Sequence, residues 1–288
     1  MIKVFFLLLL SFDLHASIKL TLNSELAIGS EIELKVKDKN QKLAGIFLGR
    51  MSDHPTLGDE ILLFNKSAKE VQMIDVGNAS ASFSKDNLQA VVSPYDQAGE
   101  TCAAYALFHY WYQTAEFGFS GNGILAEAFK TERSRMKFLE EAITRYYMGR
   151  SANLHLVMKK FGDRLGFKCR EKVFNEVPKA ADYLFQRALT GKPIIMEFFI
   201  GPKMAQLPYR LMDFETGFEF DPRLWIPRRI GERNSGGHAI VAIGAFEFEG
   251  KKMLVVLDSN WTEPRLWDLD EYFSSKTAID EMIFHSCD

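Results

Sequence analysis

Three residues of types that support nucleophilic catalysis are spread along the chain: Cys102, His238 and Asp258. Cys102 follows Thr101, an acceptable N-cap residue, and opens an apolar run that predicts a helix. The first turn of a helix stabilises an anion through its unpaired N–H groups and the helix dipole, which favours a thiolate at Cys102. A lone cysteine is more commonly an inert buried residue, so Cys102 alone does not decide the chemistry.

A thiol nucleophile needs a base and a third group that orients the base. His238 is the best placed of the six histidines, because it follows the flexible segment "NSGG" and begins the predicted strand "HAIVAIG". The next predicted strand, "MLVVLD", ends at Asp258, and in an antiparallel hairpin the end of one strand lies beside the start of its partner. The sequence therefore predicts a site built from Cys102, His238 and Asp258, with Asn260 as the rival for the third position.

The elements that must position these residues follow from the periodicity of the apolar residues after position 88. Helical spacing predicts helices over 102–116, 131–148, 153–165 and 177–190. Strand patterns follow over 192–200, 238–248 and 252–258, with "FEG" as a hairpin signal between the last two. Helices first and strands second predict an α+β fold, in which a helical half packs on an antiparallel sheet half and the site lies between them.

Residues 17–80 have a different pattern. Four short aliphatic segments, separated by turn residues, predict a small antiparallel sheet or barrel of four or five strands: "EIELKVKD", "KLAGIFLG", "DEILLFN" and "EVQMIDVG". A small, polar stretch follows. We therefore expect a small β domain at 17–80, a linker at 81–90 and a larger domain at 91–288.

The first 16 residues have the features of a secretory signal peptide. Lys3 supplies the positive end, residues 4–12 are apolar apart from Ser11, and Ala16 stands at a plausible cleavage point. The alternative for this segment is a buried N-terminal strand. We expect an exported protein, periplasmic or secreted, in which disulfides are permitted. No other segment approaches the roughly 20 apolar residues that span a bilayer.

The cysteine count bears on which thiol is reactive. An odd number in an exported protein leaves at least one thiol free or paired between chains, and the three here are Cys102, Cys169 and Cys287. One arrangement joins Cys169 to Cys287 and leaves Cys102 reactive, but the sequence leaves this pairing open. The net charge of −3 gives no reason to expect nucleic acid or an anionic membrane surface as a partner.

Other residues able to bind metals or substrates have simpler explanations. No Cys/His spacing typical of zinc sites occurs, and His155 and His285 have no matching ligands near them in the sequence. His109 is on the same helix face as Cys102, but about 10 Å along the axis, too far to share one ion. We therefore predict no metal and no cofactor. The arginine-rich segment 221–233 is most simply a solvated face, with a substrate-facing loop or a proteolytic nick site as alternatives.

Taken together, the motifs resemble the papain-like cysteine peptidases. Members of that family have a Gln, then a Cys at a helix start, then a distant His before a glycine-ending apolar strand, then an Asn or Asp. The matching segments are "DQAGETCAAYA", "GGHAIVAIG" and "LVVLDSNW", and the resemblance covers about residues 90–288. "GKPIIMEFF" and "RLWDLDEYF" also look like this wider group, which includes bacteriocin-leader-type peptidases with an acid at the third position.

The resemblance implies a papain-like hydrolase domain at 91–288 that acts on a peptide or protein substrate. It assigns Cys102 as nucleophile, His238 as general base, Asp258 as orienting group, Gln97 as an oxyanion-hole donor beside the Cys102 N–H, and Trp261 as the shield of the His–Asp pair. Two departures are visible. Gln97 is one residue closer to Cys102 than is usual, and the family's Asn-Ser-Trp appears as Asp-Ser-Asn-Trp, so Asp258 and Asn260 compete. Residues 17–80 do not resemble the family's helical inhibitory region and are expected to form an accessory domain.

The leading hypothesis is a thiol hydrolase, most simply a cysteine peptidase, that cleaves amide bonds through an acyl-enzyme on Cys102. One alternative is a transglutaminase-like acyltransferase, which uses Cys, His and Asp in the same order. The 136 positions between Cys102 and His238 (238 − 102) are long for the compact members of that group. The other alternative is a catalytically inactive papain-like module used for binding, for which the displaced Gln97 is the main support.

Overall fold

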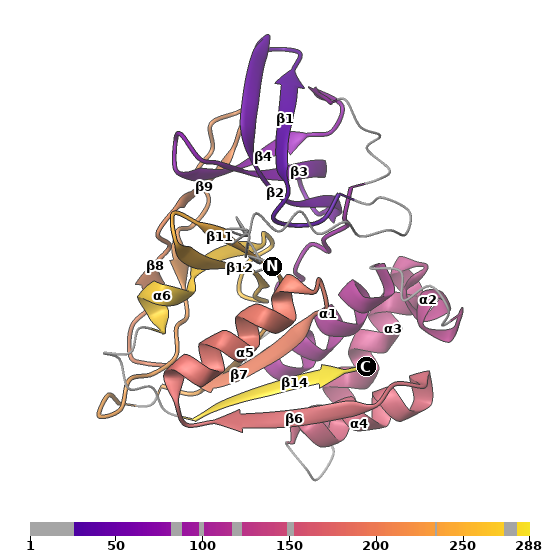
Figure 1. Cartoon of the computed structure of the whole chain (residues 1–288). Coiled ribbons are helices and arrows are strands. Elements are labelled where there is room, and N and C mark those ends of the chain that lie inside the picture. The colour runs from indigo at the N-terminus through magenta and orange to yellow at the C-terminus, as the bar shows by residue number, and fades with distance from the viewer. Residues whose placement is uncertain are drawn as a thin grey trace, which may run out of the picture.

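A computed structural model of the chain describes residues 26–81, 88–97, 101–116, 123–148, 153–233, 235–273 and 281–288. The predicted signal peptide and most of the predicted linker lie outside the described residues, as does the start of the predicted β domain. The architecture is mixed α+β (Figure 1). Among the described residues, no helix is long and apolar enough to cross a membrane.

The larger, C-terminal part of the chain is built on a six-stranded sheet in the order β13-β12-β11-β7-β14-β6, and every neighbouring pair is antiparallel. Its strands are β6 (Cys169–Phe174), β7 (Ile194–Phe199), β11 (Gly237–Phe248), β12 (Lys251–Leu257), β13 (Arg265–Asp268) and β14 (Met282–Cys287). The predicted strands over 192–200, 238–248 and 252–258 are confirmed as β7, β11 and β12. Strand β14 comes late in the sequence, yet it lies between β7 and β6.

Helices cover both faces of this sheet (Figure 1). They are α1 (Cys102–Glu116), α2 (Gly123–Phe129), α3 (Glu132–Ile143) with the π-helical turn η2 (Thr144–Met148), α4 (Leu154–Leu165), α5 (Val177–Leu189) and the short α6 (Leu269–Tyr272). Alternate residues of β11 point to opposite faces, so Val241 and Ile243 share a core with α1, whereas Ile240 and Ala242 share one with α5. The expected helical half is therefore divided, because α5 packs on the face opposite α1.

Local capping explains where two of the helices begin and end. Thr131 accepts a hydrogen bond from the Ser134 N–H and donates its own N–H to Ser134, which starts α3. The Asn153 side chain accepts a hydrogen bond from the Leu156 N–H at the start of α4, and Gly166, with φ of +82°, ends this helix in the left-handed conformation. The predicted helices over 102–116, 131–148, 153–165 and 177–190 are confirmed, with the end of the second forming η2, while α2 was not predicted.

The N-terminal region forms a second six-stranded sheet in the order β5-β1-β2-β3-β4-β9. Its strands are β1 (Glu31–Val36), β2 (Gln41–His54), β3 (Gly58–Asn65), β4 (Glu70–Asp75), β5 (Ala79–Ser80) and β9 (Arg210–Asp213). The first four pair antiparallel, as the sequence predicted. Strand β9 comes from the C-terminal part and pairs parallel with β4, which the sequence did not predict. The strands that flank β9 in the sequence, β8 (Ala205–Gln206) and β10 (Arg223–Leu224), pair with each other in a separate two-stranded ribbon.

The two sheets share a packed junction at the β11–β12 hairpin, where the N-terminal sheet, drawn in indigo, meets the rest of the molecule (Figure 1). The Phe64 ring contacts Tyr209 and Phe248 at centroid distances of 4.9 and 4.8 Å. Lys69 forms an ion pair of 2.9 Å with Glu249. The N-terminal sheet therefore packs on the larger part through a continuous apolar core.

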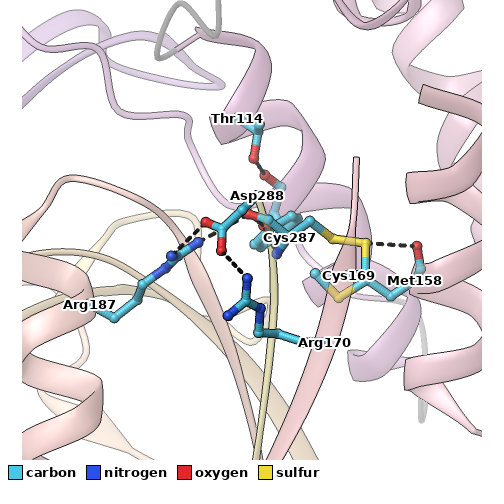
Figure 2. Close-up of a disulfide and its surroundings, with 8 residues drawn as sticks. Thr114, Met158, Cys169, Arg170, Arg187, Cys287 and Asp288 are labelled. Atoms are coloured by element: carbon cyan, nitrogen blue, oxygen red, sulfur yellow. Dashed lines mark hydrogen bonds and ion pairs between the residues drawn. A yellow bond between two sulfur atoms is a disulfide. The ribbon is translucent and has the colours of Figure 1, made fainter. Parts of the chain in front are cut away.

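A disulfide joins Cys169 on β6 to Cys287 on β14 (Figure 2). This is the pairing that the sequence left open, and it leaves Cys102 with a free thiol. Figure 2 shows Asp288 beside the bridge, where its carboxylate contacts Arg187 at 2.7 Å and Arg170 at 3.0 Å. Covalent and ionic contacts thus fix the end of β14 against its neighbours.

We expect the Cys169→Ala/Cys287→Ala double variant to lose about 2–5 kcal/mol of unfolding free energy, because the bridge restricts the unfolded chain over a long loop. The two cysteines are separated by 118 positions. Urea denaturation under non-reducing conditions measures the difference. Wild type in dithiothreitol is the control and should unfold near the midpoint of the double variant. A double variant as stable as oxidised wild type would contradict the expectation.

Candidate active site

Four of the predicted site residues line one cavity of about 540 Å³: Gln97, Cys102, His238 and Asn260. Asp258 is buried on the side of the imidazole ring away from Cys102, and only 1% of its surface is exposed. Residues far apart in the sequence therefore meet where the start of α1 faces the start of β11.

Cys102 is the first residue of α1 and is half-buried. The N–H groups of Ala104 and Tyr105 donate to the Thr101 carbonyl, which sets the start of the helix at this point. The Cys102 Sγ atom lies 3.8 Å from the Gly237 carbonyl oxygen, and Cys102 lines the same cavity as His238. The helix start thus presents the thiol to the sheet edge and to the cavity.

His238 and Asp258 are brought together by the β11–β12 hairpin. His238 is the second residue of β11, and Asp258 directly follows β12, whose last residue, Leu257, pairs with Val241. The His238 Nε2 atom lies 3.0 Å from Asp258 Oδ1 and 3.1 Å from Oδ2. An ionised carboxylate only accepts, so Nε2–H donates to Asp258 and Nδ1 is the ring nitrogen available to Cys102.

The charges of this pair support each other. Burial opposes a charge on His238, but the Asp258 carboxylate, its hydrogen bond and Cys102 outweigh burial and raise the pKa of His238 to about 10. Burial also opposes a charge on Asp258, yet His238 and the N–H groups of Asn260 hold the pKa of that carboxyl below its usual range. At neutral pH the site therefore holds an imidazolium between a carboxylate and the Cys102 thiol.

The contacts of Asn260 bear on whether Asn260 or Asp258 is the residue that orients His238. Its backbone N–H and its Nδ2 amide donate to Asp258 Oδ1 at 3.0 and 2.9 Å. Its Nδ2 atom is 3.2 Å from His238 Nε2, but both nitrogens carry hydrogens in this arrangement and cannot bond to each other. The geometry favours Asp258 as the partner of His238, with Asn260 holding the carboxylate.

Gln97 lies at the cavity despite its shorter spacing from Cys102. Its N–H donates to the Ser259 carbonyl at 2.7 Å, and the Ser259 hydroxyl donates to Gln97 Oε1 at 2.6 Å. Because Ser259 holds Oε1, the amide NH2 group of Gln97 points the other way, where it can act as a donor. The segment that follows Asp258 thus positions Gln97 as well.

Trp261 belongs to the apolar cluster behind the site. The backbone N–H of Trp261 donates to the Asp258 carbonyl at 3.1 Å, and the Arg265 guanidinium lies 4.6 Å from the centre of the Trp261 ring. The ring that meets the His238 imidazole edge-on is Phe198 of the same cluster, at a centroid distance of 5.8 Å. Phe198 therefore covers His238 in a way that the sequence did not predict.

Comparisons with known proteins do not show a family for this chain. No protein-family model matches it, and no curated protein matches it. Among solved structures, UfSP from C. elegans is similar over 67% of this chain and 32% of that chain, with 11% identity and a TM-score of 0.34. The chain thus spans about a third of the length of that structure, and a TM-score this low does not establish a shared fold.

Other parts of the cavity wall come from residues that were not predicted to belong to the site. The wall includes Glu197 of β7, Tyr146 and Tyr147 of η2, and also Trp225 and Gly236. Burial, Glu197 and Cys102 together raise the pKa of Tyr146 to about 12, so its hydroxyl stays protonated. An acid inside the apolar segment "KPIIMEFF" was the available signal for Glu197.

The two glycines before His238 leave space over the site. Gly236 has φ of +139°, a conformation that side chains rarely adopt. A Cβ atom built on Gly236 or Gly237 would have no atom within 4 Å, so both border open space. The backbone beside Cys102 is therefore accessible to a bound molecule.

A buried arginine lies near Asp258, and the sequence did not reveal it. Arg265 of β13 is 1% exposed, and its guanidinium donates to the Asp221 carbonyl at 2.5 Å. Burial lowers its pKa to about 10 although Glu263 and Asp258 oppose this, so Arg265 remains charged at neutral pH. This second cation helps to keep Asp258 ionised.

The structure gives one outcome for His109 and a different one for His155 and His285. His109 is fully buried and accepts the Tyr95 N–H at 2.9 Å, and burial lowers its pKa to about 3, so it is a neutral core residue. The expectation that His155 and His285 lack ligands nearby is wrong in three dimensions. Their ligand atoms and that of Glu171 all lie within 4.8 Å of one another, because α4, β6 and β14 meet there.

Proposed function

We propose that this chain is a papain-like thiol hydrolase, a cysteine peptidase that cleaves peptide or other amide bonds. One observation carries the proposal: a free thiol at a helix start lines the same cavity as His238, whose Nε2 atom is 3.0 Å from the buried Asp258 carboxylate. The open cavity beside the thiol offers room for a substrate. The papain-like layout, with the cysteine helix packed on the sheet that carries the histidine, belongs to the same proposal.

The arrangement supports acyl transfer through a thioester. The Cys102 thiolate attacks the substrate carbonyl carbon, and the carbonyl π electrons move to the oxygen, which the Cys102 N–H and the Gln97 amide stabilise. The oxyanion then collapses and the C–N bond breaks, while His238 Nδ1–H protonates the leaving amine. Water attacks the thioester with His238 as its base, which releases the acid and returns the thiolate and the imidazolium.

The other residues act through this pair. Asp258 holds the His238 tautomer and stabilises its charge, and Asn260 holds Asp258. Trp261 and Phe198 keep water away from the ion pair, which strengthens it. Glu197, Tyr146 and Trp225 shape the space beside the thiol and contact the substrate.

We also propose that the chain is exported through a signal peptide at 1–16. The disulfide supports this, because such bridges persist in oxidising compartments. In this proposal residues 17–80 form an accessory domain joined by a linker at 81–90 to the hydrolase domain at 91–288. The segment 221–233 borders the cavity through Trp225.

An electrophilic thiol probe tests the proposal on wild type, Cys102→Ala and Asp258→Ala, followed by cleavage of a peptide library. Wild type should be labelled once, at Cys102, and should cleave peptides, whereas Cys102→Ala should do neither. Asp182→Ala, an exposed position on α5, is the matched control for Asp258→Ala. Labelling without cleavage would contradict the hydrolase, and incorporation of an added amine without net hydrolysis would identify an acyltransferase instead.

A further inference from the structure

We propose that His155, Glu171 and His285 bind a divalent transition-metal ion, with Zn²⁺ as the best match, and that Glu197 orients His285 for this purpose. The ligand atoms of the first three lie within 4.8 Å of one another. They come from α4, β6 and β14, which pack together. The inference goes beyond the proposed thiol hydrolase and does not depend on it.

His285 is the buried member of the set, and it has a carboxylate near each of its two ring nitrogens. It is 1% exposed, and its Nε2 atom lies 3.1 Å from Glu197 Oε2. The carboxylate can only accept, so Nε2–H donates, and in the neutral imidazole Nδ1 carries a lone pair that can bind an ion. That lone pair lies 3.7 Å from Glu171 Oε2 and has no hydrogen-bond partner within the described part of the chain. Glu171 Oε2 is also an electron-pair donor, so a cation between the two atoms would be bound by both.

His155 completes the set. Its Nδ1 atom is also buried without a hydrogen-bond partner among the described residues. Its ring is stacked on that of His285, with centroids 6.0 Å apart and an interplanar angle of 23°. Two imidazole nitrogens and one carboxylate oxygen form a ligand set that suits Zn²⁺ and leaves one position open, and this set disfavours Mg²⁺ and Ca²⁺.

The spacing is close to what a tetrahedral ion needs. Zinc–ligand distances of about 2.0–2.2 Å place the ligand atoms of one ion roughly 3.3 Å apart. The ligand atoms, which lie up to 4.8 Å apart, must therefore approach one another by as much as about 1.5 Å around the ion. Glu171 can supply this movement, because it is largely exposed at the open side of the cluster, where an ion would enter.

The disulfide holds two of the ligands in place. In the β6–β14 register, Cys169 pairs with Cys287 and Glu171 pairs with His285 two positions away, so both pairs lie on the same face of the sheet. Helix α4 covers that face, and the Met158 carbonyl oxygen lies 3.6 Å from Cys169 Sγ (Figure 2). The bridge therefore fixes the register that sets Glu171 opposite His285, beneath the helix that carries His155.

Glu197 has the position of the carboxylate that often supports a metal-bound histidine. Such a carboxylate accepts the second N–H of the imidazole, which fixes the tautomer and the ring orientation. Glu197 also lines the cavity that contains Cys102. The proposed ion site and the thiol are thus connected through one side chain.

Zn²⁺ titration by calorimetry and Co²⁺ absorption test the proposal on the full chain in a Cys102→Ala background, because Cys102 and His238 could themselves bind the ion. We expect one ion per chain and absorption bands of tetrahedral Co²⁺. Glu171→Gln and His155→Ala should each weaken binding at least about 10-fold. Glu140→Gln, an exposed position on α3, is the matched control and should bind as the background does.

Three results would overturn the proposal: no uptake by the background variant, uptake that Glu171→Gln and His155→Ala leave unchanged, or uptake by wild type that disappears in Cys102→Ala. The last would assign the ion to the thiol instead. Both ligand substitutions are at positions that are not fully buried, so the fold should persist, and circular dichroism checks this.

Discussion

The His238→Ala variant should alkylate with iodoacetamide at a rate that rises about 200-fold between pH 6 and pH 9, as an ordinary thiol with a pKa near 8.5 does. Wild type should change only a few-fold over the same range. The reason is the imidazolium of His238, which persists below pH of about 10. The proposed mechanism requires this positive charge beside Cys102 to favour the thiolate, and the pH profile tests that requirement.

The measurement is how the alkylation rate changes with pH, not its absolute value. A thiol with a lower pKa is more ionised, but its thiolate is a weaker nucleophile, so these two effects on the absolute rate partly cancel. Iodoacetamide is small and needs no oxyanion hole, so the assay isolates the thiol and its partner. Wild type unfolded in urea is the control and should follow the variant. If folded wild type already shows the ordinary thiol profile, the proposed ion pair is absent.

Asp258→Ala should move the alkaline limb of peptide cleavage, the high-pH side on which the rate falls, to lower pH. In wild type, the carboxylate and its hydrogen bond outweigh burial and raise the pKa of His238, so the imidazolium is lost only as the pH rises through about 10. Without Asp258, burial dominates and the pKa of His238 falls to its ordinary 6.5 or below. The cleavage rate at pH 8 should then drop about 30-fold or more, since at most roughly 3% of His238 stays charged and only the charged form can protonate the leaving amine.

A second substitution of Asp258 separates the effect of its charge from the effect of its hydrogen bond to His238, and a variant at another position serves as the control. Asp258→Asn removes the charge but can keep a hydrogen bond to His238, so its limb should lie between those of wild type and Asp258→Ala. Asp182→Ala removes an exposed carboxylate on α5 and should leave the profile unchanged. A limb near pH 10 that survives in Asp258→Ala would show that Asp258 does not set the charge of His238.

The local parts of the fold and site could be predicted from the sequence. Thr101 and the apolar run after it marked the start of α1, and that start places Cys102. His238 and Asp258 meet because a single hairpin joins their strands, and hairpin pairing follows from local strand and turn patterns. Each of these relations spans a short stretch of chain, where periodicity and turn chemistry determine the geometry.

Long-range pairing could not be predicted from one sequence. The parallel addition of β9 to β4 and the insertion of β14 between β7 and β6 depend on tertiary packing. For that reason the sequence left the Cys169–Cys287 pairing open. It also gave no indication that His155, Glu171 and His285 would meet, since their elements become neighbours only when β14 enters the sheet.

The position of β14 has a consequence for how the protein is made. On the ribosome, β7 and β6 emerge long before β14, yet β14 supplies the hydrogen bonds that connect them. The sheet, the disulfide and the His285 contacts can therefore form only after residue 287 has been synthesised. Until then the nascent chain exposes an unpaired strand edge, which favours aggregation. A product truncated before β14 should consequently be recognised by chaperones and proteases as unfinished.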